Sequence, residues 1–193
     1  SFSRRQRQMC IRDRNKIVCG ICGEFKFISK SFDNEKLNNL MDSISTRGID
    51  SQGRYMDDDV FLGHHRLAII DTSNKSNQPM QVGKYVIVFN GVIFNYRELR
   101  SALLKKGHSF SSSGDTEVII RSYIEYGSSC VNYLDGVFAF SIYDTENKKL
   151  FLARDRIGIK PLYFLHESGQ LYFSSHMKGI IKNMVKKKIN PIA

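Results

Sequence analysis

Residues 137–153 read VFAFSIYDTENKKLFLA, two apolar runs joined by the polar segment 145–148. Both runs are rich in apolar and aromatic residues, and a short polar segment between two such runs predicts a β-hairpin. The same pattern recurs in 162–174, where Glu167-Ser168-Gly169 separates two apolar runs. Because strands joined by short turns pair antiparallel, these segments predict an antiparallel sheet.

Three helices are predicted between the strand-forming segments. In the first, apolar residues recur at i, i+3, i+4 and i+7 after a suitable N-cap residue. In the second, Asn95 and Glu98 have the spacing of a capping box. The first helix is predicted to begin at Asp33 and to end at Thr46-Arg47-Gly48. The second is predicted from Asn95 to Gly107, and the third from Asp115 to Gly127.

Further strands are predicted at 18–28, 60–62, 67–70 and 85–89. The helices are grouped between runs of strands and do not alternate with them one by one. This order predicts an α+β fold with antiparallel sheets, in which the helices cover the outer sheet faces.

The composition is that of one globular domain, with 193 residues of which 41% are hydrophobic and 25% charged. No apolar run reaches the roughly 20 residues that a membrane-spanning helix requires. The arginine-rich N-terminal segment also lacks the apolar core of a secretion signal. We therefore expect a cytoplasmic protein without a membrane partner.

The net charge of +10 is concentrated at the two ends of the chain. Residues 1–18 hold six basic residues and one acidic residue, whereas 177–193 hold five lysines and no acidic residue. The segment between them is balanced and offers no basic face for phosphates, so we expect no nucleic-acid partner. Because 1–18 lack apolar periodicity, we interpret them as an extraneous or cleaved extension, and 182–193 as a basic tail.

The cysteines at positions 10, 19, 22 and 130 are too few and too unevenly spaced for a disulfide framework. Cys19 and Cys22 form a CxxC motif without a second ligand pair, so we expect no metal site. A thioredoxin-like CxxC would open a helix, whereas residues 24–28 alternate like a strand. This pattern disfavours a redox role.

An ordered series of short motifs runs from Cys19 to about residue 181. The motifs are Cys19-Gly20-Ile21-Cys22-Gly23, Arg47-Gly48-Ile49-Asp50, His65-Arg66-Leu67-Ala68-Ile69-Ile70-Asp71, Gln78-Pro79-Met80, Asn90-Gly91, Asp115-Thr116-Glu117, Gly136-Val137-Phe138-Ala139-Phe140, Arg154-Asp155-Arg156 and Gly158-Ile159-Lys160-Pro161-Leu162-Tyr163. Together they resemble the class II glutamine amidotransferase domain of glutamine-hydrolysing asparagine synthetases, which would occupy 19–181. The resemblance implies an N-terminal-nucleophile hydrolase fold, a four-layer αββα sandwich.

The resemblance also implies catalytic residues. Cys19 would be the first residue of the mature chain and the nucleophile, with its own α-amine as the base. The Asn90 side-chain amide and the Gly91 N–H would form the oxyanion hole. The residues alone leave two alternatives open: a buried cysteine is commonly a small apolar residue, and Asn-Gly between two β-rich runs is typical of a type I′ hairpin turn.

A glutamine-binding site is implied in the same way. Arg66 would hold the substrate carboxylate bidentately, and Asp115 would hold the ammonium group. The pattern alone is equally compatible with Asp115 as a helix N-cap. The other implied glutamine-binding residues are Leu67, Ala68, Ile69, Ile70, Gly91, Val92 and Ile93.

Val92 departs from the family pattern, in which a glutamate at this position helps to hold the ammonium group. Thr46, Ile49 and His176 also replace residues that are usual in the family. Two alternatives to an asparagine synthetase part therefore stay open: the glutaminase domain of another class II amidotransferase, or a non-catalytic amidotransferase-like binding module.

The expected function is hydrolysis of L-glutamine to glutamate, which supplies ammonia for asparagine synthesis. The resemblance implies no cofactor in this domain. ATP and Mg would be needed only by a C-terminal synthetase domain of the parent chain, which is the expected partner, and the chain would be a fragment that ends before it. A homodimer is compatible with the resemblance.

Overall fold

A computed structural model describes residues 18–28, 31–68 and 70–183 of the chain. The strands are β1 (Gly20–Lys26), β2 (Ser51–Met56), β3 (Val60–Arg66), β4 (Met80–Val82), β5 (Tyr85–Ile93), β6 (Gly136–Asp144), β7 (Lys149–Arg154), β8 (Tyr163–Glu167) and β9 (Gln170–Ser174). The α-helices are α2 (Asn34–Ser43), α3 (Tyr96–Lys105), α4 (Asp115–Tyr126) and α5 (Met177–Asn183). Two short 3₁₀ helices cover Asn74–Ser76 and Gly127–Asn132.

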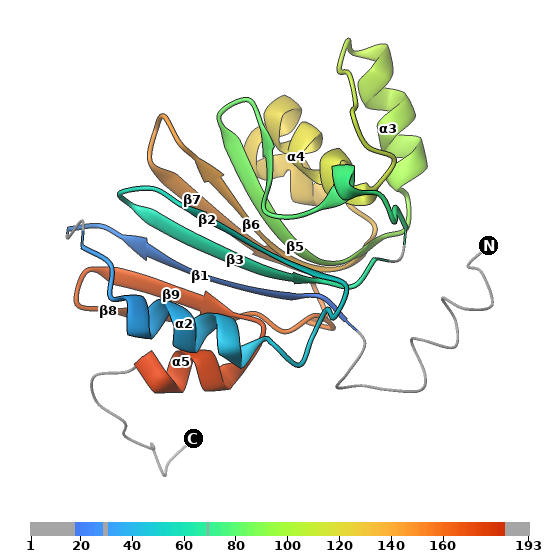
Figure 1. Cartoon of the computed structure of the whole chain (residues 1–193). Helices are drawn as coiled ribbons and strands as arrows, with labels where there is room; N and C mark the ends of the chain where they lie inside the picture. Colours follow the sequence, from blue (N-terminus) through green and yellow to red (C-terminus); the bar gives the residue numbers. More distant parts are fainter. Residues whose placement is uncertain (1–17, 29–30, 69, 184–193) are drawn as a thin grey trace.

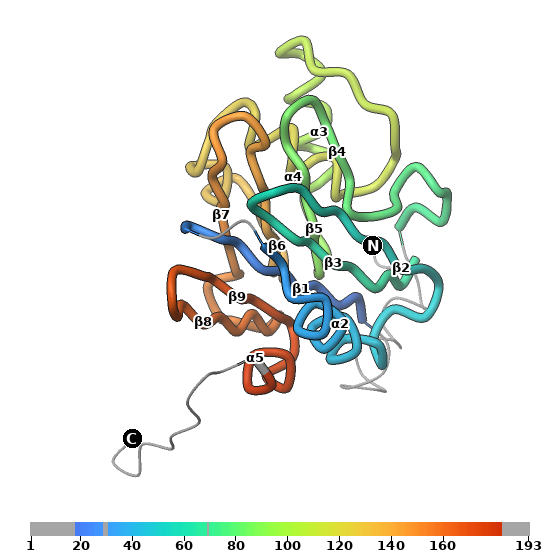
Figure 2. The backbone as a smooth tube through the Cα atoms, turned by 60° about the vertical axis from the view of Figure 1, so that its left-hand side comes forward, coloured from blue at the N-terminus to red at the C-terminus, as the bar shows by residue number. Residues whose placement is uncertain are grey.

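The strands form two antiparallel sheets that face each other (Figure 1). One sheet has the order β2-β3-β1-β9-β8, and the other has the order β4-β5-β6-β7. Helices α2 and α5 lie next to each other on the outer face of the first sheet (Figure 2). Helices α3 and α4 cover the outer face of the second sheet. The result is the predicted four-layer αββα sandwich, and the α+β prediction is confirmed.

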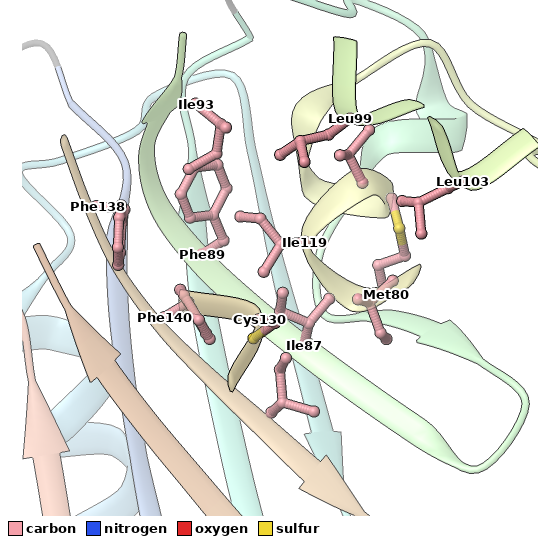
Figure 3. Close-up of a cluster of buried hydrophobic side chains, with 13 residues drawn as sticks. Met80, Ile87, Phe89, Ile93, Leu99, Leu103, Ile119, Cys130, Phe138 and Phe140 are labelled. Atoms are coloured by element: carbon pink, nitrogen blue, oxygen red, sulfur yellow. The ribbon is translucent and has the colours of Figure 1, made fainter. Parts of the chain in front are cut away.

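The alternation of side chains along each strand builds three cores. Between the sheets, Ile21 and Phe25 of β1 pack against Val86 and Val88 of β5. The intervening residue Cys22 points to the other face of β1 and packs under α2. A third core fills the space between the second sheet and the helices α3 and α4 (Figure 3).

Several of the predicted elements are confirmed. Both hairpins form, as the pairs β6–β7 and β8–β9. Asp33 caps α2 by accepting the N–H groups of Glu35 and Lys36. Gly107 and Gly127 end α3 and α4 with φ angles of 93° and 60°, a backbone region that favours glycine.

Other predicted elements were wrong. No strand forms in the described part of 67–70, because β3 already ends at Arg66. The strands β2 and β4 were not predicted. The capping box in α3 is absent: the Asn95 side chain bonds the Tyr133 carbonyl and the Asp135 N–H instead.

The two chain ends are only partly covered by the structure. Helix α5 continues through Lys182 to Asn183, so it includes the first residues of the predicted basic tail. The extension before residue 18 and the tail after residue 183 lie outside the described residues. Their assignment as separate segments stays a prediction.

Candidate active site

A small pocket lies at the end of the sandwich where β1 begins and β3 ends. It brings together residues from four separate parts of the chain. The lining residues are Cys19, Arg66, Leu67, Ile70, Asp71, Ser76, Gln78, Phe89, Gly91, Val92, Gly114, Asp115 and Thr116. Most of the predicted site residues therefore meet around one cavity. Ala68, Asn90 and Ile93 do not line it, and Ile69 lies outside the described residues.

Cys19 is the residue immediately before β1, and its thiol faces the chain after β3. The Leu67 N–H donates a hydrogen bond to the Cys19 Sγ at 3.3 Å, and the Leu67 carbonyl lies 3.5 Å from the same sulfur. Burial raises the pKa of the thiol, although the Leu67 N–H and the positive charges of Lys160 and Arg66 oppose this shift. The thiol is therefore mostly protonated at neutral pH and needs a base to become a nucleophile.

Arg66 is the last residue of β3, with only 6% of its surface exposed. Its guanidinium donates to the carbonyls of Ser73 and Asp71 and to the Asn77 side-chain oxygen. Among the described residues, no carboxylate forms an ion pair with it. Arg66 is thus a buried cation that can still take an anion.

Asp115 is the first residue of α4, and it too is 6% exposed. Its Oδ2 accepts the Ile93 N–H at 3.0 Å. Burial raises its pKa to about 6, while N–H groups of Ile93, Asp115 and Thr116 act in the opposite direction. No described cation forms an ion pair with it. The N-cap position belongs to Gly114, so the N-cap interpretation of Asp115 is wrong.

Asn90 and Gly91 lie in the middle of β5, paired with Ala139 and Phe138 of β6. They do not form a turn, so the hairpin-turn alternative is excluded. The Asn90 side chain is almost fully buried, and its Nδ2 has no hydrogen-bond partner among the described residues. A Cβ atom at Gly91 would lie 2.3 Å from the Val137 carbonyl oxygen, so only glycine fits there. The pair thus offers one unused amide donor beside a closely packed backbone.

The predicted residues Val92, Ile93 and Ala68 differ in burial and in hydrogen bonding. Val92 lines the pocket as a half-buried side chain, so an apolar group stands where the family pattern has a carboxylate. Ile93 is buried in the core, and its N–H supports Asp115. The Ala68 N–H donates to the Asp50 side chain at 2.8 Å, which fixes the chain just after Leu67.

Several residues at or near the site were not predicted to belong to it, among them Gln78 and Arg47. Gln78 lines the pocket and joins two elements: its Oε1 accepts the Phe89 N–H at 2.6 Å, and its Nε2 donates to the Thr116 hydroxyl at 3.1 Å. Arg47 is 8% exposed, and its stem packs over Gly20, next to Cys19. Both residues stand in the motif series, but spacing along the chain gives no sign of their contacts.

Metal and membrane features are absent from the described residues. No group of three or more histidine, cysteine or acidic residues there can hold a metal ion. No helix in the same part of the chain is long and apolar enough to span a membrane. Cys19, Cys22 and Cys130 are free thiols.

Solved structures with a similar architecture identify the fold. The glutamine phosphoribosylpyrophosphate amidotransferase of Bacillus subtilis superimposes with a TM-score of 0.67 at 20% identity, over 84% of this chain and 43% of that chain. A second structure, described as the allosteric regulatory enzyme of purine biosynthesis, gives a TM-score of 0.64 at 17% identity. The fold is therefore that of the N-terminal-nucleophile amidotransferases, as the resemblance predicted.

Sequence comparison identifies the family. The family model described as glutamine amidotransferase domain matches residues 18–193, and the chain belongs to that family. Asparagine synthetase [glutamine-hydrolyzing] 3 of Bacillus subtilis is 38% identical over 170 residues, which are 85% of this chain and 27% of that protein. The corresponding protein of Zea mays is 38% identical over 166 residues, 84% of this chain and 28% of its own length. The chain thus spans little more than a quarter of these relatives.

Proposed function

We propose that this domain hydrolyses L-glutamine to glutamate and ammonia, with Cys19 as the nucleophile. The observation that carries the proposal is a pair of buried charged groups, Arg66 and Asp115, which have no ion-pair partner among the described residues and share a pocket with the Cys19 thiol. A free amino acid has one carboxylate and one ammonium group, which complement these two charges. A planar guanidinium suits a carboxylate better than an ammonium would.

The proposed reaction begins with removal of the Cys19 thiol proton by the α-amine of the same residue. An α-amine has a pKa of about 7.7 to 8.0, which suits a base at neutral pH. The sulfur attacks the side-chain amide carbon of glutamine, and the Asn90 Nδ2 and the Gly91 N–H stabilise the developing oxyanion. The amine returns its proton to the leaving nitrogen, and ammonia departs. Water then cleaves the thioester to give glutamate and the free thiol.

This mechanism requires Cys19 to have a free α-amine. In the 193-residue chain the Cys19 nitrogen forms a peptide bond with Val18. We therefore propose that the active form begins at Cys19, after removal of the residues before it. Val18 is also where the match to the family model begins, which supports a boundary at this position.

The relatives named above support a role in asparagine synthesis. We propose that the ammonia serves an ATP-dependent synthetase domain of the parent protein, with aspartate activated there as the acceptor. ATP and Mg would belong to that domain, and the glutaminase reaction needs no cofactor. The parent protein would act in the cytoplasm.

Val92 favours a second candidate, an amidotransferase-like module that binds a partner without hydrolysing glutamine. The pocket has one carboxylate fewer for the substrate ammonium than the family pattern provides. Asp115 still supplies one, and Cys19, Asn90 and Gly91 are all present, so we prefer the active enzyme. Activity of the form that begins at Cys19 distinguishes the two candidates.

The test compares Cys19→Ala with Cys22→Ala in protein that begins at residue 19. Cys19→Ala should lower glutamine hydrolysis by on the order of 10³-fold or more, because the nucleophile is lost. Because an alanine at position 19 retains the α-amine, the loss would report the thiol alone. Cys22 is buried against Met41, and its Sγ lies 3.8 Å from the Met41 sulfur, so Cys22→Ala should retain most activity. Glutamate release measures both, and equal loss in the two variants would contradict the proposed nucleophile.

A further inference from the structure

Two segments support the groups that would hold the amino-acid part of glutamine, Arg66 at the end of β3 and Asp115 at the start of α4. The first is the loop 71–77, which Arg66 contacts through the carbonyls of Asp71 and Ser73 and the side chain of Asn77. The second is the turn Ser113–Asp115, which leads into α4. They are far apart in the sequence, so their relative position depends on tertiary contacts.

The Asp71 side chain joins these two segments. Its Oδ1 accepts the Ser73 N–H at 2.8 Å, and its Oδ2 accepts the Ser76 hydroxyl at 2.8 Å, which closes the loop on itself. The same Oδ2 accepts both the N–H and the hydroxyl of Ser113, each at 3.0 Å. One buried carboxylate therefore makes four hydrogen bonds and spans both segments.

The two segments also touch directly beside this carboxylate. A Cβ atom at Gly114 would lie 2.9 Å from the Ser76 Oγ and 3.5 Å from the Asp71 Cβ. Gly114 immediately precedes Asp115, and Asp71, Ser76 and Gly114 all line the pocket. A shift of the loop against the turn would therefore change the distance between the Arg66 guanidinium and the Asp115 carboxylate.

We propose that Asp71 is a positioning residue for glutamine binding. Its carboxylate holds the loop 71–77, which Arg66 contacts, against the first turn of α4, and so fixes the spacing between the carboxylate-binding and ammonium-binding groups. This inference rests on the proposed glutaminase function. It adds that recognition of the two charged groups is cooperative, because one residue holds both of their binding groups in place. Asp71 itself does not touch the reacting amide.

The hydrogen bonds support a carboxylate rather than an amide at this position. Burial opposes ionisation of Asp71, but bonds from Ser73, Ser113 and Ser76 outweigh it and hold the pKa of the carboxyl below its usual range. In Asp71→Asn, the side-chain oxygen can replace only one of the two acceptors. The amide nitrogen would face the Ser73 N–H or the Ser113 N–H, neither of which can accept a hydrogen bond, so at least one bond to the loop or to the turn must break. The remaining bonds to both segments weaken as well, because they lose the negative charge of their acceptor.

The first experiment needs no enzymatic activity and uses the full 193-residue chain. Amide hydrogen exchange is compared between the parent, Asp71→Asn and a control, Asp144→Asn. Asp144 is also buried and accepts the N–H groups of Glu146 and Asn147, but it lies in the β6–β7 turn. Asp71→Asn should speed exchange both in 72–77 and in 113–116, whereas the control should speed it only around 145–148. Unchanged exchange in either pocket segment would overturn the proposal.

The second experiment measures kinetics in protein that begins at Cys19. Asp71→Asn should raise the KM for glutamine about ten- to a hundred-fold, with kcat within about threefold of the parent. Its preference for glutamine over the analogue without the α-amino group should shrink by a similar factor. Asp144→Asn should change neither. An unchanged KM, or an equal loss for both substrates, would overturn the positioning role.

The two experiments separate this inference from the proposed function. If the parent neither binds nor hydrolyses glutamine, the glutaminase proposal fails. The exchange pattern still decides whether Asp71 couples the two segments. If the parent is active and only the exchange pattern is as expected, Asp71 is a structural residue and the inference fails alone.

Discussion

The charged side chains at one end of strand β3 form ion pairs, whereas those at the other end form none with any described residue. Just before β3 begins, Asp57 and Asp59 form ion pairs with Lys148, at 3.3 and 3.2 Å. Where β3 ends, Arg66 and Asp115 share a pocket, and neither has a described partner of opposite charge. Paired charges stabilise the fold on their own, whereas buried unpaired charges raise its energy until a ligand of the right charge arrives. The comparison therefore separates a structural end of β3 from the end that we propose binds the substrate.

The pKa values of two aspartates express the same difference. Burial opposes ionisation of Asp57, but the N–H groups of Asp59 and Val60 outweigh it and lower the pKa of this carboxyl. For Asp115 burial is the stronger influence, and it raises the pKa to about 6. The substitutions below test this contrast, beginning with the largest expected effect.

Asp115→Asn should weaken glutamine binding and strengthen the fold. The KM should rise at least about a hundred-fold, because the substrate ammonium would be buried without a counter-charge. The unfolded chain ionises this carboxyl near pH 4 and the folded chain near pH 6, so the folded state loses relative stability as the pH rises through this interval. The variant should therefore be more stable than the parent at pH 7.5, by up to about 3 kcal/mol.

The stability part is measured by urea unfolding of the full chain at pH 7.5 and pH 4. The advantage of Asp115→Asn should disappear near pH 4, where the parent carboxyl is protonated in the folded state. Asp57→Asn is the matched control, for which the opposite change is expected. Because folding lowers the pKa of Asp57 in the parent, the Asp57→Asn variant should be less stable than the parent at pH 7.5. A variant Asp115→Asn that is less stable than the parent at pH 7.5 would contradict the contrast.

Arg66→Lys should raise the KM for glutamine about ten- to a hundred-fold and leave kcat nearly unchanged. A lysine keeps the charge but cannot bond three loop acceptors and a carboxylate together. The control is Arg54→Lys, since Arg54 is exposed and bonds only the Asn38 side chain among the contacts described. Steady-state kinetics of both variants, in protein beginning at Cys19, measure the KM and kcat for glutamine. An equal effect of the two substitutions would mean that Arg66 holds no substrate carboxylate.

Val92→Glu should lower the KM for glutamine about tenfold, because it restores a second carboxylate near the substrate ammonium. The value of kcat should stay close to that of the parent, since the added contact acts on ground state and transition state alike. Absence of activity in both the parent and Val92→Glu would instead support the non-catalytic module.

Lys148→Met should have the smallest effect, a loss of less than about 1 kcal/mol in the free energy of unfolding. The Lys148 side chain is 47% exposed, so solvent weakens its ion pairs. Glutamine kinetics should be unchanged, because Lys148 lies at the structural end of β3. A change in KM would show that the two ends are not independent.

The sequence predicted the helices α2, α3 and α4 and the two hairpins because their signals are local, whereas α5 was not predicted. Asp33 caps its helix in the way expected from the chain around it, and the turns at 145–148 and at Ser168-Gly169 form between the expected strands. Strand β2 reads SQGRYM and alternates between half-buried and exposed residues, so it lacks the apolar pattern that marks a strand. Its position at the edge of the sheet explains why it needs so few apolar residues.

The candidate site was predicted through motif resemblance, whereas its supporting contacts were not. Arg66, Asp115 and Cys19 stand in separate motifs, and only the fold shows that they line one pocket. Asn95 illustrates the limit of local patterns. Its spacing to Glu98 is that of a capping box, but a distant segment around Tyr133 provides better partners for its side chain. The roles of Gln78 and Asp71 depend on such long-range contacts and have no local signal.

Helix α4 connects the binding pocket to the hydrophobic core. Asp115 is its first residue, while Val118, Ile119 and Ile120 are fully buried in the core against the second sheet. Figure 3 shows Ile119 in this core. Close-packed interiors transmit displacements, so a smaller side chain at Ile119 would let the helix settle and carry its first residue with it. In the proposed glutaminase, substrate affinity would thus be adjustable from inside the core, by substitutions that contact neither the solvent nor the ligand.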